Sequence, residues 1–378
     1  MKGKKIVSTL LVLLLLASLP VSAHAAVWDI GKGDITISAG SGGQTVTQGD
    51  GAAVEDSAPV ITGSSTENTV TINAEKDQTA SVTLSGADID VSGKGKAAVS
   101  TTGEGNVSIE LDGENTLKSA TNHAGLEKNN GGSLTIADED KNGKLTAEGG
   151  IYGAGIGGGY EGEGSNIAIT GGEVKATGGK YGAGVGGGLS GNGNHITITG
   201  GEVKATGGLN GAGIGGGLWG KGKDITISGD AQLKVQGGVG DYFDGPGAGI
   251  GDGGSRPKES TGGNPIPGTE VEPDTSGLTT NGSIEYYAPG ADMEKDKPEK
   301  TTVGTLPPQE KPVEPIEPAE PEQPEAERGM DAPLYRVTDR DGRNIAYTAE
   351  QKGGVLTVTA DEDLAILTGR LSGIRTLK

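Results

Sequence analysis

A glycine-rich segment recurs in this chain at a fixed spacing of 29 residues. YGAGIGGGY (152–160), YGAGVGGGL (181–189) and NGAGIGGGL (210–218) follow one another at that spacing, and a fourth version, PGAGIGDGG, lies at 246–254. A regular period of this length is typical of repeat proteins, in which each repeat packs mainly against its neighbours. The fold must therefore explain both the period and the abundance of glycine.

Short segments of alternating apolar and polar residues accompany the glycines. NIAIT (166–170), HITIT (195–199) and DITIS (224–228) align across the repeats, with the period of two expected for half-buried strands. A second set lies at 173–177, 202–206 and 232–236. Three short strands per repeat predict an all-β fold, a right-handed parallel β-helix whose coils stack ~4.8 Å apart. With weaker copies of the pattern nearer the start of the chain, we expect roughly eight or nine coils.

The alternation also predicts which side chains fill the coils. Ala154 and Ile156 should point inward, so the core should be narrow and aliphatic, in keeping with a single phenylalanine in the whole chain. Gly153, Gly155 and Gly157 should then face outward. Stacked over several coils, these glycines are expected to form a strip of bare backbone that a ligand can approach closely.

Composition divides the chain into four parts. Residues 1–26 contain three lysines, an apolar run and the sequence AHA, which predict a secretory signal peptide and a secreted or cell-surface protein. Residues 27–255 hold the repeats and form the predicted β-helix. Residues 256–333 are rich in proline and acidic residues and predict a disordered linker. Residues 334–378 alternate again and predict a small β-rich module.

The charge and the cysteine content exclude several classes of protein. A formal net charge of −20 at pH 7 makes nucleic acid an implausible partner, because nucleic-acid binding requires a basic surface. No cysteine is present, so neither disulfides nor a lipid-attachment cysteine can occur. No apolar stretch after the signal peptide is long enough for membrane insertion.

The segment ITITGGEVKATGGLNGAGIGGG (196–217) resembles the glycine-rich repeats of exported proteins from Gram-positive bacteria that are labelled carbohydrate-binding-domain-containing. The resemblance is strong over 151–255 and weaker over 60–150. It implies a pectate-lyase-like β-helix without the lyase site, and the same larger group includes a calcium-associated β-helix that binds acidic plant polysaccharides without cleaving them. Residues 334–378 resemble a module that follows such repeats and usually continues with more strand, which implies a domain cut short here.

Aromatic residues of the repeat region border the glycine segments. Tyr152 and Tyr181 hold equivalent positions in adjacent coils and should form a ladder one coil apart. Because sugar rings stack on aromatic faces, we predict a polysaccharide-binding surface that includes Tyr152, Tyr160, Tyr181, Trp219 and Tyr242. The alternative is that these rings only cover the corners of the rod.

The segment DEDKNG (138–143) matches the beginning of a calcium-binding loop. Asp138, Asp140 and Asn142 stand at alternate positions, and a glycine follows at the sharp turn. The full pattern requires a glutamate at its twelfth position, where this chain has Gly149. Ca²⁺ binding is one interpretation, and an ordinary Asn-Gly turn without a metal is the other.

Catalysis is the main rival to binding, since many parallel β-helices cleave acidic polysaccharides. The repeat region has no arginine before Arg256, and His123 and His195 are the only histidines after the predicted signal peptide. No pair of carboxylates stands at a spacing that suggests acid and base roles. We therefore expect a non-catalytic polysaccharide-binding or adhesion protein. A structural surface spacer without a glycan ligand, and a cell-wall or protein partner, remain alternatives.

Charged residues form a further pattern on the strands. Glu173 and Glu202 repeat at one position, and Lys175, Lys204 and Lys234 repeat two residues later. Each glutamate can pair diagonally with a lysine of the next coil, and exposed pairs of this kind are worth only ~0–1 kcal/mol. The sequence predicts a solvated face here.

Overall fold

The computed structural model describes residues 26–257 and 264–306 in full, together with the strands of the C-terminal part. Two compact units are present, Met1–Glu310 and Lys311–Lys378. The predicted signal peptide, apart from its last residue, and the predicted linker from residue 307 to 333 lie outside the described residues. The described part of the chain has only a three-residue 3-10 helix, η1 (Ile30–Lys32), and no apolar helix of membrane-spanning length.

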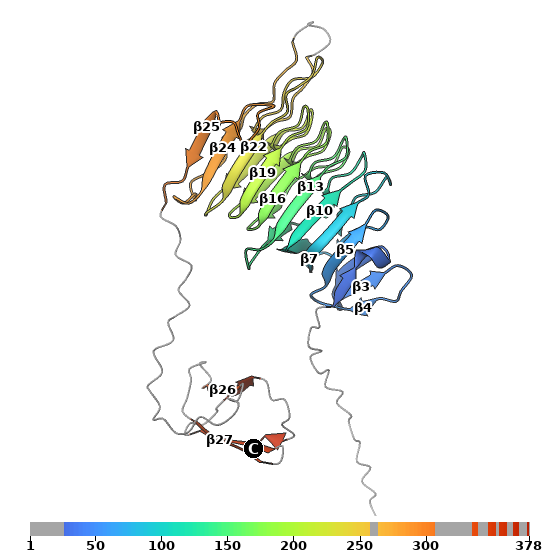
Figure 1. The fold of residues 1–378 in the computed structure, drawn as a ribbon, viewed down its shortest axis with the longest axis vertical. Coiled ribbons are helices and arrows are strands. Elements are labelled where there is room, and N and C mark those ends of the chain that lie inside the picture. Colours follow the sequence, from blue (N-terminus) through green and yellow to red (C-terminus); the bar gives the residue numbers. More distant parts are fainter. Residues whose placement is uncertain are drawn as a thin grey trace, which may run out of the picture. The chain divides into compact units, whose positions relative to one another are not determined.

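The first unit is a parallel β-helix built from three ladders of strands (Figure 1). The first ladder contains β1 (Val27–Asp29), β5 (Val60–Ser65), β7 (Thr79–Asp90), β9 (Asn106–Asp112), β12 (Leu134–Ala137), β15 (Ile167–Ile169), β18 (Gly193–Ile198) and β21 (Gly222–Ile227). The second contains the end of β7, then β10 (Glu114–Lys118), β13 (Lys144–Glu148), β16 (Glu173–Thr177), β19 (Glu202–Thr206), β22 (Gln232–Gln236) and β24 (Ser283–Tyr287). The third contains β2 (Ile35–Gly40), β6 (Val70–Ala74), β8 (Val99–Gly103), β11 (Leu126–Lys128), β14 (Ile156–Gly157), β17 (Val185–Gly186), β20 (Ile214–Gly215) and β23 (Ile250–Gly251).

Equivalent residues of successive repeats lie directly beside one another. Ile156 pairs with Val185 in the third ladder, and Val174 pairs with Val203 in the second, both in parallel register. The three-stranded coil predicted from the repeats is therefore confirmed. The second ladder holds seven strands and the other two hold eight each, so the rod has about seven complete coils, fewer than the roughly eight or nine expected. The reason is that β3 (Gly43–Gln48) and β4 (Val54–Glu55) form an antiparallel extension of β2 instead of a further coil.

The core is narrow and aliphatic, as the alternation predicts. Ala154 and Ile156 are fully buried, and the core cluster consists of Ile, Val, Leu and Ala side chains from all three ladders. The prediction of an outward glycine strip is wrong, because Gly153 and its neighbours through residue 159 are buried. A Cβ atom added to Gly153 would lie 2.0 Å from the carbonyl oxygen of His123 in the preceding coil. Glycine is needed because the turns of successive coils approach too closely for any side chain.

The rod does not end at residue 255, where the sequence places the start of the linker. Beyond that point β24 pairs in parallel with β22, and β25 (Lys300–Val303) closes the sheet by pairing antiparallel with β24. Leu278 and Ile284 are fully buried and join the core. The predicted linker boundary is thus corrected, since residues 264–306 cap the last coil. Proline and acidic residues dominate the surrounding sequence and conceal the short apolar alternation of β24.

The second unit is described only through its strands. β26 (Tyr335–Thr338) pairs antiparallel with β29 (Ile366–Gly369). β27 (Tyr347–Lys352) pairs antiparallel with β28 (Val355–Ala360), which pairs in parallel with β30 (Thr376–Leu377). The described strands are those of a small β-rich module, in the region where the sequence predicts one.

Candidate functional site

Aromatic side chains gather on the turns around the third ladder. The rings of Tyr152 and Tyr181 are stacked, with 5.6 Å between their centroids and 10° between their planes. Tyr160 meets Tyr152 edge-on, at a centroid distance of 5.5 Å. The predicted tyrosine ladder is confirmed as a geometric feature, and its role in binding stays a prediction.

The backbone sets the spacing of this ladder. The N–H of Tyr181 donates to the carbonyl of Ile151 in the preceding coil at 2.9 Å. One repeat further on, Asn210 replaces the tyrosine and is fully buried, with its Nδ2 donating to the carbonyls of Asp244 and Gly245. The ladder therefore consists of two tyrosines and ends at an asparagine that anchors the next loop.

The stacking leaves little of the inner ring faces for a ligand. Tyr152 and Tyr181 cover each other, and the ammonium of Lys180 lies 4.7 Å from the centroid of the Tyr181 ring. The side chain of Tyr181 is the main cause of the raised pKa of Lys180, and Asp241 contributes to it. The Lys180 ammonium is therefore held against the outer face of the tyrosine ladder.

A second aromatic group is more exposed. Trp219, Tyr242 and Phe243 expose 48%, 86% and 60% of their surface, respectively, and Tyr242 and Phe243 contact each other edge-on at 5.1 Å. The indole Nε1 of Trp219 donates to Asp244 Oδ1 at 3.3 Å, and Arg256 Nη2 donates to Asp244 Oδ2 at 3.1 Å. The buried Asp244 carboxylate therefore orients the indole while half of the ring stays in solvent.

We call these two groups together the aromatic ridge; it comprises Tyr152, Tyr160, Tyr181, Trp219, Tyr242 and Phe243. The sequence prediction includes all of these except Phe243. It also misses Asp244 and Arg256. The adjacency of Asp244 to the YF pair is a local signal that could have found it, whereas Arg256 reaches the ridge only through the fold.

A further carboxylate, which the sequence prediction misses, lies beside the predicted calcium loop. Carboxylate oxygens of Glu110, Asp138 and Asp140 lie within 4.8 Å of one another. Glu110 stands on β9 in the preceding coil, where its Oε1 accepts the N–H of Glu139 at 2.6 Å. Partial burial, and then the neighbouring carboxylates, raise the pKa of Glu110. These three carboxylates are the groups that could hold a cation.

The polar groups of the same loop also form hydrogen bonds with one another. Asp138 accepts the N–H groups of Asn142 and Gly143 at 3.2 and 3.0 Å. Asn142 donates its Nδ2 to Asp140 at 2.8 Å and accepts the N–H of Gly113 at 3.3 Å. Since Asn142 is engaged by the turn itself, the geometry agrees with either interpretation of the DEDKNG segment.

A buried polar cluster stands next to the tyrosine ladder, in the coil before it. Glu127 is 6% exposed and pairs with Gly157 in register, so that it occupies a position held by glycine in the following coil. Its Oε2 contacts His123 Nδ1 at 2.9 Å, and its Oε1 accepts from Asn129 at 2.7 Å. Lys128 is also buried, which lowers its pKa to about 8. The sequence interpretation assigns no role to this cluster.

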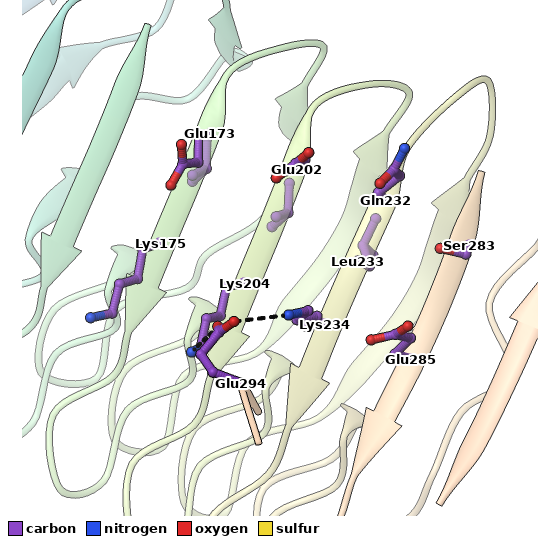
Figure 2. Close-up of a pocket in the computed structure, with 12 residues that line it drawn as sticks. Glu173, Lys175, Glu202, Lys204, Gln232, Leu233, Lys234, Ser283, Glu285 and Glu294 are labelled. Carbon is purple, nitrogen blue, oxygen red and sulfur yellow. Dashed lines mark hydrogen bonds and ion pairs between the residues drawn. The ribbon is translucent and has the colours of Figure 1, made fainter. Parts of the chain in front are cut away.

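The charged strand pattern forms the floor of a groove of about 600 Å³ on the outer face of the second ladder (Figure 2). One row contains Glu173, Glu202, Gln232 and Ser283, and a second row contains Lys175, Lys204, Lys234 and Glu285. The predicted diagonal pairs do not form. Glu173 pairs with Lys144 at 2.9 Å, and Glu294 from a distant loop pairs with both Lys204 and Lys234.

Comparison with known proteins supports the fold. Residues 141–160, 167–189 and 196–218 match the family model described as Beta helix repeat. No curated protein and no solved structure matches the chain. The matched segments span three consecutive repeats and include Tyr152, Tyr160 and Tyr181. Over these repeats the chain is therefore similar to beta helix repeat proteins, a likeness of architecture that leaves the ligand open.

Proposed function

We propose that this protein is a secreted or cell-surface, non-catalytic polysaccharide-binding protein whose β-helix presents the aromatic ridge to a glycan. The observation that carries the proposal is the exposure of Trp219 and Tyr242 on a protein whose core is aliphatic. An exposed aromatic group beside polar residues is typical of binding surfaces, because moving such rings out of water and into contact with a ligand lowers the free energy. The resemblance to glycine-rich exported repeats supports the fold and export more than it supports the ligand.

The structure changes the way in which a glycan would be bound. The glycines are buried, so a sugar cannot lie on a strip of bare backbone. Contact has to come from the exposed rings of Tyr160, Trp219 and Tyr242, with Lys180 and Arg256 as neighbouring hydrogen-bond donors. In this proposal the stacked pair of Tyr152 and Tyr181 mainly supports the ridge.

A spacer without a ligand and a polysaccharide-cleaving enzyme are the alternatives. Two assays of the full chain distinguish these three functions. One measures binding to a glycan array, and the other follows the incubation of the protein with polygalacturonate. Binding to a defined set of glycans, with no new chain ends in the polygalacturonate, is the expected result. Silence on all glycans would favour the spacer, and the release of unsaturated oligosaccharides would favour a lyase.

A further inference from the structure

The third ladder ends at β23. In the interior of this ladder, each coil donates main-chain N–H groups forward to carbonyls of the next coil. The N–H of Gly213 donates to the carbonyl of Ala248 at 2.9 Å, and that of Ile214 donates to Gly249 at 3.0 Å. In the last coil the equivalent N–H groups belong to Gly249 and Ile250. These two donors lie at the edge of the ladder and need acceptors of another kind.

A glutamate side chain supplies both acceptors. Glu270 Oε1 accepts the N–H of Gly249 at 2.6 Å, and its Oε2 accepts the N–H of Ile250 at 3.2 Å. One carboxylate thus takes the place of two carbonyls of a further coil. Hydrogen bonds to a charged acceptor are stronger than those between neutral groups. Glu270 therefore closes the edge of β23 through polar contacts.

The main chain around Glu270 lies along the edges of two ladders; we call residues 268–274 the edge segment. Beyond β23, the carbonyl of Thr269 accepts the N–H of Asp252 at 3.0 Å. Beside β21, the carbonyl of Asp274 accepts the N–H of Ile227 at 2.9 Å. No residue of the edge segment is buried. Hydrogen bonds rather than apolar packing hold this segment in place, so it can open without unfolding the rod.

We propose that the edge of β23 is a strand-pairing surface for a second copy of this chain, and that Glu270 blocks this surface in the single rod. Once Glu270 is removed, the edge offers the N–H groups of Gly249 and Ile250. It also offers the Ile250 carbonyl, which otherwise accepts the N–H of Val271 at 2.8 Å. An open strand edge of this kind pairs readily with another edge.

Two features of the edge point to a second copy as the partner. The edge has both donors and an acceptor, so it is complementary to itself, as a two-fold contact requires. The starting edge of the same ladder is covered by β3, which pairs antiparallel with β2 and blocks head-to-tail joining of two rods. The expected assembly is therefore a dimer through β23. This surface does not depend on the proposed glycan contact.

Amide hydrogen exchange of the full chain, measured in dilute solution, tests whether Glu270 closes the edge. Glu270→Gln keeps one acceptor oxygen and Glu270→Ala keeps none. The N–H groups of Gly249 and Ile250 should exchange about tenfold faster or more in the alanine variant, and by a smaller factor in the glutamine variant. Glu272→Ala is the matched control, because Glu272 lies in the same segment but pairs with Lys300 at 2.8 Å. This control should leave both amides protected.

Sedimentation velocity over a range of protein concentrations tests the pairing itself. The unaltered protein and Glu272→Ala should sediment as monomers, whereas Glu270→Ala should form dimers as its concentration rises. A Glu270→Ala variant that stays monomeric although its amides exchange fast would show that the open edge does not pair. Unchanged amide exchange, larger aggregates in place of dimers, or equal association of the unaltered protein would each overturn the proposal as well.

Discussion

Tyr152 and Tyr181 lie face to face in adjacent coils, with 10° between their ring planes. Their contact follows from the in-register pairing that places Ile156 beside Val185 four residues later. In the regular repeats, each side chain therefore lies beside the equivalent side chains of the neighbouring coils. This relationship gives the ridge and the groove their periodic character, and it also determines where substitutions are tolerated.

Gly182→Ala should destabilise the rod strongly. A Cβ at this position would lie 1.9 Å from the carbonyl oxygen of Gly153, so the coils would have to separate. We expect a loss of about 3 kcal/mol or more, or failure to fold, measured by thermal unfolding. Gly42→Ala is the matched control, because no atom lies within 4 Å of the added Cβ. Equal stability of the two variants would contradict the close packing of the glycine turns.

Glu294 should titrate at a lower pH than an ordinary glutamate. Hydrogen bonds from Lys204 and then Lys234 lower its pKa below 4.5. The two ion pairs therefore stabilise the position of the loop between β24 and β25 above the ordinary pKa of glutamate, and this stabilisation is lost as pH falls through the lowered value. NMR titration of the Glu294 carboxyl carbon measures the midpoint. Replacing Lys204 and Lys234 by glutamine should return it towards 4.5, and a midpoint at or above 4.5 in the unaltered protein would contradict the pairing.

Lys128 should make the protein more stable as the pH rises above neutrality. Burial lowers its pKa from 10.5 to about 8, so the folded state releases this proton before the unfolded state does. Stability should therefore rise between about pH 8 and 10.5, as the folded state loses the charge that burial penalises. Denaturant unfolding at pH 7 and 9.5 measures it. The Lys128→Met variant should lack this part of the pH dependence, and equal pH profiles for both proteins would contradict the shift.

Asp138→Ala should lower stability even without a metal. The substitution leaves the N–H groups of Asn142 and Gly143 without their carboxylate acceptor, and we expect a loss of about 1–3 kcal/mol.

Calorimetry with Ca²⁺ on the unaltered protein tests the interpretation of this loop as a calcium site. Heat of binding that disappears in Glu110→Gln would establish a cation site, whereas unchanged stability of Asp138→Ala would show that the hydrogen bonds of the turn contribute little.

The sequence predicts the features that depend on the repeat. The period and the alternation of residues 166–177 are enough to predict the coil, its inward side chains and the tyrosine ladder. Features formed between unlike segments could not be predicted in this way. Glu110 joins Asp138 from an irregular earlier coil, and Glu294 reaches Lys204 across 90 residues of sequence. The outward glycine strip failed for another reason, because alternation says nothing of how closely two turns approach.

Polysaccharide retention by ridge variants of the full chain tests the functional proposal most directly. Trp219→Ala combined with Tyr242→Ala should strongly weaken retention on the glycan that the array identifies, because two of the three exposed rings assigned to the glycan contact are removed and only Tyr160 is left. Tyr242→Phe, which keeps the ring, should retain it. Unchanged retention after loss of both rings would contradict the assignment of the aromatic ridge as the glycan contact.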